Sequence, residues 1–509
     1  MKIVIVGGGT AGWLAALMIN KINPEHELTV IESSTIGIVG AGEGSTGFLT
    51  SVIRGSFWDF GCDIENFIKE TGASFKYGIL HKSWKEIGKD YYGPIGGSPS
   101  QNNIVDFIFA YYHTHSPDYL NRCSDLGWAT EKGISPLNLS NFKLDKFEFA
   151  LHFDANAVGK YFKKITLKNP TVKLYDDEVI KVNLNEQGHI SSLLLKSNKQ
   201  IDGDFFIDAS GFKRILSNAL DVKWISYKNN LPVNSAMPFL IDYKEDEIPE
   251  LYTTAWAQSS GWMWQIPTLV RKGCGYVFCD DFITADKAQE EIEKTLGRSI
   301  DPTRIIKFET GRLERLWTKN CLSIGLASSF AEPLEATSIH TTITQLIQFN
   351  FEFLKDTLED TLNEGSLNSY NRQTAKMYDM TKEFLVAHYA GGRTDSEFWK
   401  YISNEETMSN FCSDIVSTCK SRFPSNRDLC SPSFGEPDIS LWLHVLAGTG
   451  HLKQSISQDA IKKGVGFILG QDKSIKPIIS EYENKVKMLH SNTMKFSDYF
   501  KLTRKNICS

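Results

Sequence analysis

A glycine cluster at the start of the chain has the spacing of a nucleotide-binding turn. The hexapeptide Gly7–Gly12 fits GxGxxG and stands between the β-branched run of residues 2–6 and a helical stretch that reaches about residue 22. Glycines at these places permit a tight turn and a close approach of the backbone to a pyrophosphate, and the following helix N-terminus attracts phosphates. Glu32 lies 20 residues after Gly12 at the end of a second buried run, where a carboxylate can accept a hydrogen bond from a ribose 2′-hydroxyl. The pattern predicts a dinucleotide site made by Gly7, Gly9, Thr10, Ala11, Gly12 and Glu32.

Two later segments favour FAD over NAD as the dinucleotide. Asp208 ends an apolar run and opens the turn Asp208–Gly211, and Gly325 follows a second run at residues 320–323. Late strand–turn elements of this kind commonly close around the rest of an FAD, although both could be ordinary core strands. Since no second nucleotide-binding fold is visible in the sequence, we expect FAD, with Asp208 and Gly325 beside it.

The elements that must position these residues form a strand–helix–strand unit within the first thirty or so residues. This order predicts an α/β fold with a Rossmann-like, two-dinucleotide-type FAD-binding core. Short strands expected between residues 171 and 283 would add a further β-sheet. We expect residues 1–400 to form the FAD-binding core, and residues 401–509 to form a mainly helical C-terminal region that contributes to the substrate pocket.

Composition narrows the class of partner. The chain has 509 residues, a net charge of −6 and a pI near 6.0, so it has no basic surplus for binding nucleic acid or an anionic membrane. It has no run of 18 apolar residues, and its nine cysteines form no CxxC pair, which predicts a cytoplasmic protein with reduced thiols. The 11 histidines show no metal-ligand spacing, so no metal site is predicted. A small or neutral partner fits best, and a homo-oligomer is only a default expectation.

From residue 1 to about residue 400 the sequence resembles the flavin-dependent halogenases of the tryptophan type. The segment Gly261–Pro267 reads GWMWQIP and matches the WxWxIP motif, which separates these halogenases from ordinary aromatic hydroxylases. Further segments resemble family blocks, in chain order: Gly40–Ser45, Gly72–Trp84, Asp208–Gly211 and Asn320–Ile339. The first of them resembles the flavin-contacting loop GVGEAT, which assigns Gly42, Glu43 and Ser45 to the cofactor.

The resemblance implies a reaction and roles for several residues. In the family, reduced FAD from a separate flavin reductase reacts with O2, a halide attacks the resulting flavin hydroperoxide, and hypohalous acid travels through a short tunnel to an electron-rich aromatic ring. Lys76 matches the lysine that positions or activates this electrophile, and Glu335 matches the carboxylate that assists deprotonation of the ring. Thr337 and Ser338 match the positions whose backbone N–H groups bind the halide. The family commonly has glycine in place of Ser338, so the preference among chloride, bromide and iodide stays open.

Four aromatic residues are expected to shape the substrate side. Trp262 and Trp264 match rings that stand between the flavin and substrate compartments, although two tryptophans spaced by one are more often sheet-core residues. Tyr92 and Trp442 are predicted to line the pocket. Residues 88–105 are rich in Gly, Pro, Ser and Asn, which predicts a long surface loop that could serve as a lid.

The substrate segments depart from the tryptophan-halogenase pattern. A His-Pro-Phe segment of those enzymes corresponds here to Tyr91–Ile95, and the tyrosines and acids that hold the amino-acid part of tryptophan are not evident near residues 430–450. An indole, a phenol or another electron-rich ring is therefore at least as good an expectation as free tryptophan. The alternative function is aromatic hydroxylation by a flavin monooxygenase of the same fold.

Overall fold

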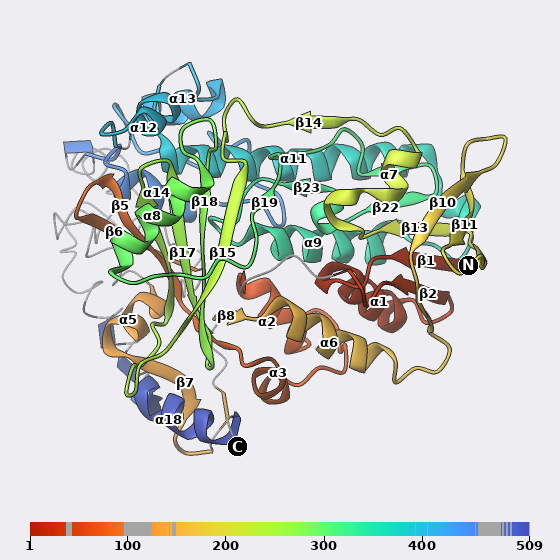
Figure 1. Ribbon diagram of the computed structural model, residues 1–509, viewed down its shortest axis with the longest axis horizontal. Helices are drawn as coiled ribbons and strands as arrows, with labels where there is room; N and C mark the ends of the chain where they lie inside the picture. Colours follow the sequence, from red (N-terminus) through yellow and green to blue (C-terminus); the bar gives the residue numbers. More distant parts are fainter. Residues whose placement is uncertain are drawn as a thin grey trace. The chain divides into compact units, whose positions relative to one another are not determined.

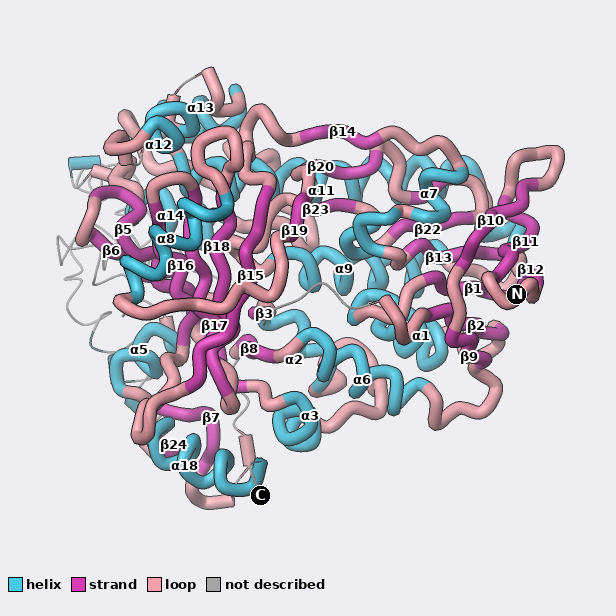
Figure 2. Tube along the Cα trace, viewed as in Figure 1, coloured by secondary structure: helices cyan, strands magenta, loops and turns pink. Residues whose placement is uncertain are grey.

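The chain forms two compact units, each assembled from three segments. Unit 1 contains Met1–Ala73, Phe153–Leu231 and Lys307–Lys382, and unit 2 contains Ser74–His152, Pro232–Ile306 and Glu383–Ser509. The elements of both units are drawn in Figures 1 and 2. The computed structural model describes residues 1–36, 43–95, 124–141, 143–144, 149–391, 393–404, 406–453, 455–456, 480, 483–484, 487–488 and 491–507.

The predicted Rossmann-like core is confirmed in unit 1. Its main sheet contains β1 (Lys2–Val6), β2 (Glu27–Glu32), β9 (Lys173–Asp176), β13 (Phe205–Asp208), β21 (Trp317–Thr318) and β22 (Cys321–Ser323). The strand order is β21-β22-β13-β1-β2-β9, and every neighbouring pair is parallel except the antiparallel pair β21 and β22. The run KIVIV forms β1 inside this sheet, because β-branched residues suit a strand that is covered on both faces.

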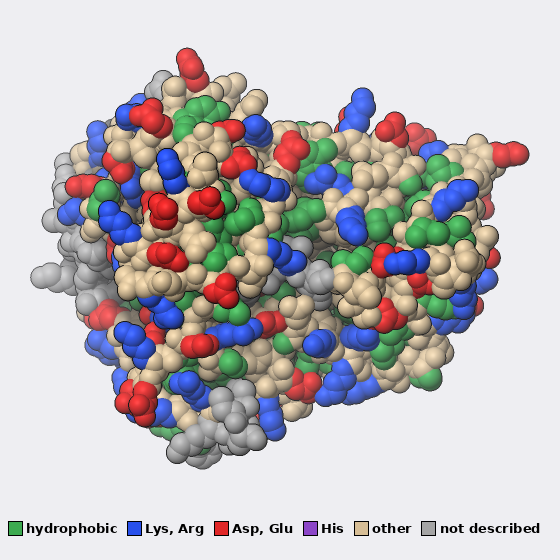
Figure 3. Space-filling model, in the orientation of Figure 1, with side chains coloured by type: hydrophobic (Ala, Val, Ile, Leu, Met, Phe, Trp, Pro, Cys, Tyr) green, Lys and Arg blue, Asp and Glu red, His purple; other side chains and the backbone are tan. Residues whose placement is uncertain are grey.

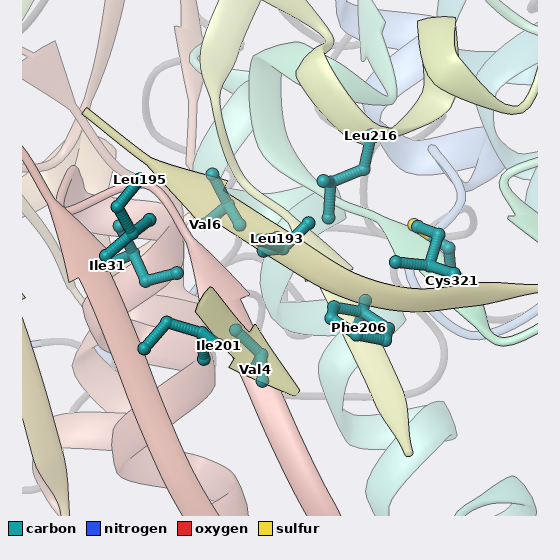
Figure 4. Packing of buried hydrophobic residues seen from close by; sticks show 10 residues of the cluster. Val4, Val6, Ile31, Leu193, Leu195, Ile201, Phe206, Leu216 and Cys321 are labelled. Atoms are coloured by element: carbon teal, nitrogen blue, oxygen red, sulfur yellow. The ribbon is translucent and has the colours of Figure 1, made fainter. Parts of the chain in front are cut away.

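A three-stranded antiparallel sheet packs against the core sheet. Its strands are β10 (Val179–Leu184), β11 (Ile190–Leu195) and β12 (Gln200–Asp202). Its apolar side chains Leu193 and Ile201 belong to one buried cluster with Val4, Ile31 and Phe206 of the core sheet, as Figure 4 shows. This cluster fixes the strand ends from which the predicted cofactor residues project.

Helices cover the core sheet of unit 1. Helices α1 (Thr10–Ile22) and α6 (Ala155–Thr166) pack together, and the carboxylate of Asp154 caps α6 by accepting hydrogen bonds from the N–H groups of Asn156 and Ala157. The other elements of this unit are β3 (Glu43–Gly44), α2 (Gly47–Ile53), α3 (Ile64–Thr71), η2 (Gly211–Lys213), α7 (Ile215–Ala219), β14 (Trp224–Ser226), β20 (Gly311–Leu313), η3 (Gly325–Ala327), β23 (Ser329–Phe330), α9 (Thr337–Gln348), η4 (Phe349–Phe353) and α10 (Leu358–Thr361).

Unit 2 contains the expected additional sheet. Six of its strands are hydrogen-bonded in the order β15 (Ser235–Asp242), β18 (Arg271–Phe278), β17 (Gly261–Pro267), β16 (Tyr252–Gln258), β5 (Gly78–Glu86) and β6 (Lys89–Pro94). The pair β16 and β5 is parallel and the other pairs are antiparallel. Helix α8 (Ala285–Leu296) packs on this sheet through a buried cluster that includes Met237, Tyr276 and Ile292.

The prediction of a surface loop over residues 88–105 is wrong for its first part. Residues 89–94 form β6, because Tyr91 and Tyr92 bury their rings while the strand pairs with β5. Residues 96–105 lie outside the described part of the chain.

The remaining described elements of unit 2 are mostly helical towards the C-terminus. They are β4 (Ser74–Lys76), α5 (Asp125–Lys132), β7 (Ile134–Asn138), α12 (Glu397–Ile402), α13 (Asn410–Thr418), α14 (Ile439–Gly448), β24 (Thr493–Lys495) and α18 (Phe496–Ile507). The chain passes from one unit to the other within β8 (Ala150–Phe153), β19 (Ile306–Lys307) and α11 (Glu364–Tyr389). Among the described helices, none is long and apolar enough to cross a bilayer. Basic and acidic side chains alternate over the face shown in Figure 3.

Candidate active site

The glycine turn after β1 leaves one of its glycines open to a ligand. A Cβ atom at Gly7, whose φ is +120°, would lie 2.2 Å from the carbonyl oxygen of Ala209, and a Cβ at Gly12 would lie 1.9 Å from that of Gly7. Gly9 differs, because no atom of the described chain lies within 4 Å of its hypothetical Cβ. Gly7 and Gly12 therefore serve the close packing of strand and helix, whereas Gly9 presents bare backbone on an open side.

The first turn of α1 has no side-chain cap. Gly9 stands at its N-cap position and makes no side-chain hydrogen bond, so the first N–H groups of the helix are available to an anion. The hydroxyl of Thr10 donates to the carbonyl oxygen of Ala155 at 3.1 Å, which ties α1 to α6. The predicted contribution of Thr10 and Ala11 to a phosphate site fits this geometry.

Glu32 stands at the end of β2 and is held from two sides. Its carboxylate accepts a hydrogen bond from Nε1 of Trp13 at 2.9 Å and forms an ion pair with Lys163 of α6. A carboxylate has about four acceptor positions, so it can still accept from a ribose hydroxyl. The sequence pattern found Glu32 but gave no signal for Lys163, which lies 131 positions away.

Asp208 organises the turn after β13. Its buried carboxylate accepts from the N–H groups of Leu216 and Ser217, both at 2.9 Å, and from the hydroxyl of Ser210 at 2.6 Å. These bonds set the shape of the turn, and direct contact of Asp208 with a cofactor stays a prediction. Gly325 has a φ of +59°, and a Cβ there would meet the Cβ of Ala11 at 2.8 Å, so glycine is required for this approach to α1.

Glu43 carries a perturbed carboxyl group. Burial, together with the smaller effect of the nearby negative charge of Asp154, raises its pKa to about 7. Ser45 is fully buried two residues later, and Gly42 lies outside the described residues. A carboxyl that keeps its proton near neutral pH can donate a hydrogen bond to a ligand. Together with the open side of Gly9, the uncapped helix and Glu32, these residues fit an FAD.

The turn that carries Glu335 is strained on both sides. Glu332 has a φ of +135° and Ala336 has a φ of +54°, conformations that are costly for residues with a Cβ. Glu335 is half-buried between them, and α9 begins two residues later. Strain of this kind persists only where the surroundings fix the backbone, so Glu335 is held in place.

The predicted halide residues Thr337 and Ser338 stand at the start of α9. Ala336 occupies the N-cap position without a side-chain hydrogen bond, so the first N–H groups of the helix, including those of Thr337 and Ser338, are uncapped. The hydroxyls of Thr341 and Thr342 donate to the carbonyl oxygens of Thr337 and Ser338, at 3.0 and 2.8 Å, which helps to fix this first turn.

Lys76 is completely buried in unit 2. It lies on β4, which pairs antiparallel with β8 and places Lys76 opposite Ala150. Lysines are almost never fully buried unless their charge is compensated or used. This placement excludes the alternative that Lys76 is an ordinary surface lysine.

Trp262 and Trp264 are both buried on β17, with ring centroids 6.4 Å apart. Trp262 contacts Trp84 at 6.4 Å, and the ring of Trp264 lies directly over Gly275, where a Cβ would come within 2.1 Å of it. They are sheet-core aromatics in unit 2, and their part in separating two compartments stays a prediction.

The two remaining predicted pocket residues are also buried. The hydroxyl of Tyr92 hydrogen-bonds the hydroxyl of Thr130 at 2.9 Å, so its polar end is already used. Trp442 lies on α14 and packs against Phe384 and Phe411. Its Nε1 has no hydrogen-bond partner within the described chain.

Sequence reasoning did not single out one residue of this aromatic region, His81. His81 stacks on Tyr91 with centroids 4.4 Å apart and an interplanar angle of 7°, and it contacts His388 at 5.1 Å. Nδ1 of His388 lies 2.9 Å from the carbonyl oxygen of Phe384 in the preceding helical turn. The pairing of His81 with Tyr91 across β5 and β6 could have been found only by predicting that hairpin.

This chain is similar to known proteins in sequence and in fold over most of its length. The sequence matches the tryptophan halogenase family over residues 2–462. It is 32% identical over 481 residues to the tryptophan 6-halogenase SttH of Streptomyces toxytricini, covering 88% of this chain and 89% of that protein. It is 31% identical to the tryptophan 7-halogenase RebH of Lentzea aerocolonigenes, covering 78% of each. The crystal structure of SttH has a TM-score of 0.85 to this chain at 27% identity, with 98% of this chain and 99% of that chain covered.

Proposed function

This chain belongs to the tryptophan halogenase family, and we propose that it halogenates an electron-rich aromatic ring of the indole type, using reduced FAD, O2 and a halide. The observation that carries the proposal is the complete burial of Lys76 at the position that matches the family's lysine. Ring hydroxylation would need no buried ammonium group, whereas activation of hypohalous acid does.

Lys76 provides a donor in a water-poor interior. Its ammonium group donates a hydrogen bond to the oxygen of hypohalous acid, which makes the halogen more electrophilic. Because the local dielectric is low, this charge acts more strongly than it would at the surface. Because Lys76 is buried, hypohalous acid bound to it is kept away from solvent and from other side chains.

Glu335 and the start of α9 supply the remaining groups of unit 1. The carboxylate of Glu335 accepts the proton that the ring loses during substitution, as a general base. The uncapped N–H groups of Thr337 and Ser338 hold the halide by hydrogen bonds and by the positive end of the helix dipole.

The residues of unit 1 that would hold FAD are on hand, and the source of its electrons is a further part of the proposal. FAD, when bound and reduced, supplies the reaction with O2, and Gly9, the start of α1, Glu32 and Glu43 are the groups that would hold it. We propose that a separate flavin reductase delivers it, because the sequence shows no second nucleotide-binding fold.

The substrate is proposed to contain an indole ring. The relatives SttH and RebH are named for halogenation of tryptophan, which supports an indole as the reacting group. Trp262, Trp264, Tyr92 and Trp442 provide flat apolar surfaces in unit 2 that suit such a ring.

Mass spectrometry tests the proposal. The purified protein is supplied with FAD, a flavin reductase, NADH and O2, and indoles (including tryptophan) and phenols are offered with chloride, bromide or iodide in separate reactions. We expect a product heavier by one halogen from an indole. Lys76→Met and Glu335→Gln should abolish or strongly reduce it, while Lys89→Met, which changes an exposed lysine, should not.

Two results would reject the proposal. A product heavier by one oxygen, formed without halide and equally by Lys76→Met, would identify a hydroxylase. Equal halogenation by wild type and Lys76→Met would show that the buried lysine has no part in the reaction.

A further inference from the structure

Two polar residues share the buried strand face that carries Lys76. Ser74 and Lys76 are two positions apart on β4, and the β4–β8 register places His152 opposite Ser74. Residues at alternate positions of a strand, and residues directly opposite one another, lie on the same face of a sheet. Lys76, Ser74 and His152 are all buried, and Lys76 and His152 are each 0% exposed.

The hydrogen bonds of His152 determine which of its ring nitrogens carries the proton. The hydroxyl of Ser74 donates to the carbonyl oxygen of Pro267, so it must accept at its own oxygen from Nδ1 of His152, 3.4 Å away. Nε2 lies 2.9 Å from the hydroxyl of Thr253 and accepts its proton. These bonds fit a neutral imidazole protonated at Nδ1, because the Ser74 hydroxyl gives its own proton to Pro267 and can only accept from that nitrogen, which leaves Nε2 as the acceptor for Thr253.

The electrostatic surroundings of His152 also favour the neutral ring. Burial lowers the pKa of His152 well below its usual value, and the positive charge of Lys76 lowers it further. A neutral ring leaves Lys76 as the cation of this strand face, since a second positive charge would repel it in a poorly solvated environment.

We propose that His152 is a positioning residue for Lys76: through Ser74, Pro267 and Thr253 it locks β4 to β17 and β16 and so fixes the lysine. The inference rests on the proposed function, because it assumes that Lys76 is the group whose place matters. The chain of bonds ends at Pro267, the last residue of the strand that carries Trp262 and Trp264. His152 thereby sets Lys76 relative to both tryptophans.

Variants of His152 separate positioning from simple packing. His152→Phe fills the site but breaks both bonds, and a displaced catalytic group can cost about 100-fold in rate. We expect kcat for halogenation to fall about 10- to 100-fold, with little change in KM and in FAD affinity. His152→Gln has an oxygen to accept from Thr253 and an N–H to donate to Ser74, so it should recover activity to within about threefold of wild type. His26→Gln, which replaces a buried histidine of unit 1, serves as the matched control.

The thermal midpoint and the affinity for FAD separate misplacement of Lys76 from misfolding. Misplacement lowers kcat while both stay at their wild-type values, whereas a loss of fold lowers all three. Two measurements do not depend on halogenation. The ¹⁵N shifts of His152 should show the neutral Nδ1–H form at pH 7, and amine acylation of Lys76, followed by mass spectrometry, should be slow in wild type and faster in His152→Phe.

The outcomes are distinct. The inference is overturned if His152→Phe keeps the wild-type kcat, if His152→Gln loses as much activity as His152→Phe, or if the ring is protonated at Nε2. A wild-type protein that halogenates no indole or phenol would overturn the proposed function, and the ¹⁵N and acylation results would then still report whether His152 orders Lys76.

Discussion

Replacing Glu43 by glutamine should remove a pH-dependent weakness of the cofactor-free fold. Burial and then the charge of Asp154 raise the pKa of Glu43 from 4.5 to about 7. Between pH 4.5 and 7 the folded protein therefore keeps a proton that the unfolded chain releases. The stabilisation associated with this proton is complete below pH 4.5 and is lost as pH rises through that window.

The size of this change in stability follows from the difference between the folded and unfolded pKa values of Glu43. The pKa difference is 7 minus 4.5, and at about 1.4 kcal/mol per pH unit it corresponds to at most about 3.5 kcal/mol. Part of the residue remains in contact with solvent, which lowers this value. We expect Glu43→Gln to raise the free energy of unfolding by about 1–3 kcal/mol at pH 8 and to change it little at pH 4.5.

Denaturant unfolding followed by tryptophan fluorescence, at pH 4.5 and pH 8 without FAD, measures this difference. Glu186→Gln removes an exposed carboxylate of the same unit and should give no pH-dependent gain. An equal change for Glu43→Gln at both pH values, or a loss at pH 8, would show that Glu43 is charged and satisfied in the folded protein. The reasoning about its buried proton would then be refuted.

Three further predictions concern other parts of the chain. Gly12→Ala should prevent stable folding because its Cβ would lie 1.9 Å from a carbonyl oxygen, whereas Gly9→Ala should keep the thermal midpoint and weaken FAD binding about 10-fold or more, as measured by fluorescence titration. Burial lowers the pKa of His444 to about 4, so stability should fall by up to about 3 kcal/mol as pH drops from 6.5 to 4, and His444→Gln should flatten this dependence in unfolding experiments. Asp379→Asn removes the charge that Arg312 contacts at two points of 2.9 Å, and should cost about 1–3 kcal/mol in denaturant unfolding because Arg312 is mostly buried and Asp379 is partly exposed.

The parts of this fold that could be predicted from the sequence are those with local patterns. The run KIVIV, the GxGxxG turn and Glu32 lie within about thirty residues, and β1, α1 and β2 follow them as expected. The resemblance placed Lys76 and Glu335 at family positions, and the complete burial of Lys76 supports a role beyond a surface charge. Residues 89–94 were mispredicted as loop because Gly93 and Pro94 are turn-forming types, and the pairing with β5 outweighs that local preference.

Contacts between distant segments explain what the sequence could not supply. His152 hydrogen-bonds Ser74 and Thr253, and Ser74 in turn hydrogen-bonds Pro267. The tautomer of His152 therefore depends on three strands whose register no local pattern encodes. Lys163 reaches Glu32, and Asp154 perturbs Glu43, for the same reason. Each of these effects is electrostatic and short-ranged, so an error of one residue in strand register would remove it.

The chain order gives a physical reason why Ser74, Lys76 and His152 lie where they do. Ser74 and Lys76 directly follow the first point at which the chain passes between units, and His152 is the last residue before the second. A segment at such a boundary is preceded in the chain by residues of one unit and followed by residues of the other, and both units are folded. It therefore has less conformational freedom than the tip of a surface loop. Groups whose position must be exact benefit from supports of this kind, because a lysine on a free loop would lose orientation even if it kept its charge. The perturbations that matter most for Lys76 should accordingly be those that loosen β4 and β8, and substitutions at the exposed ends of the same unit should leave it in place.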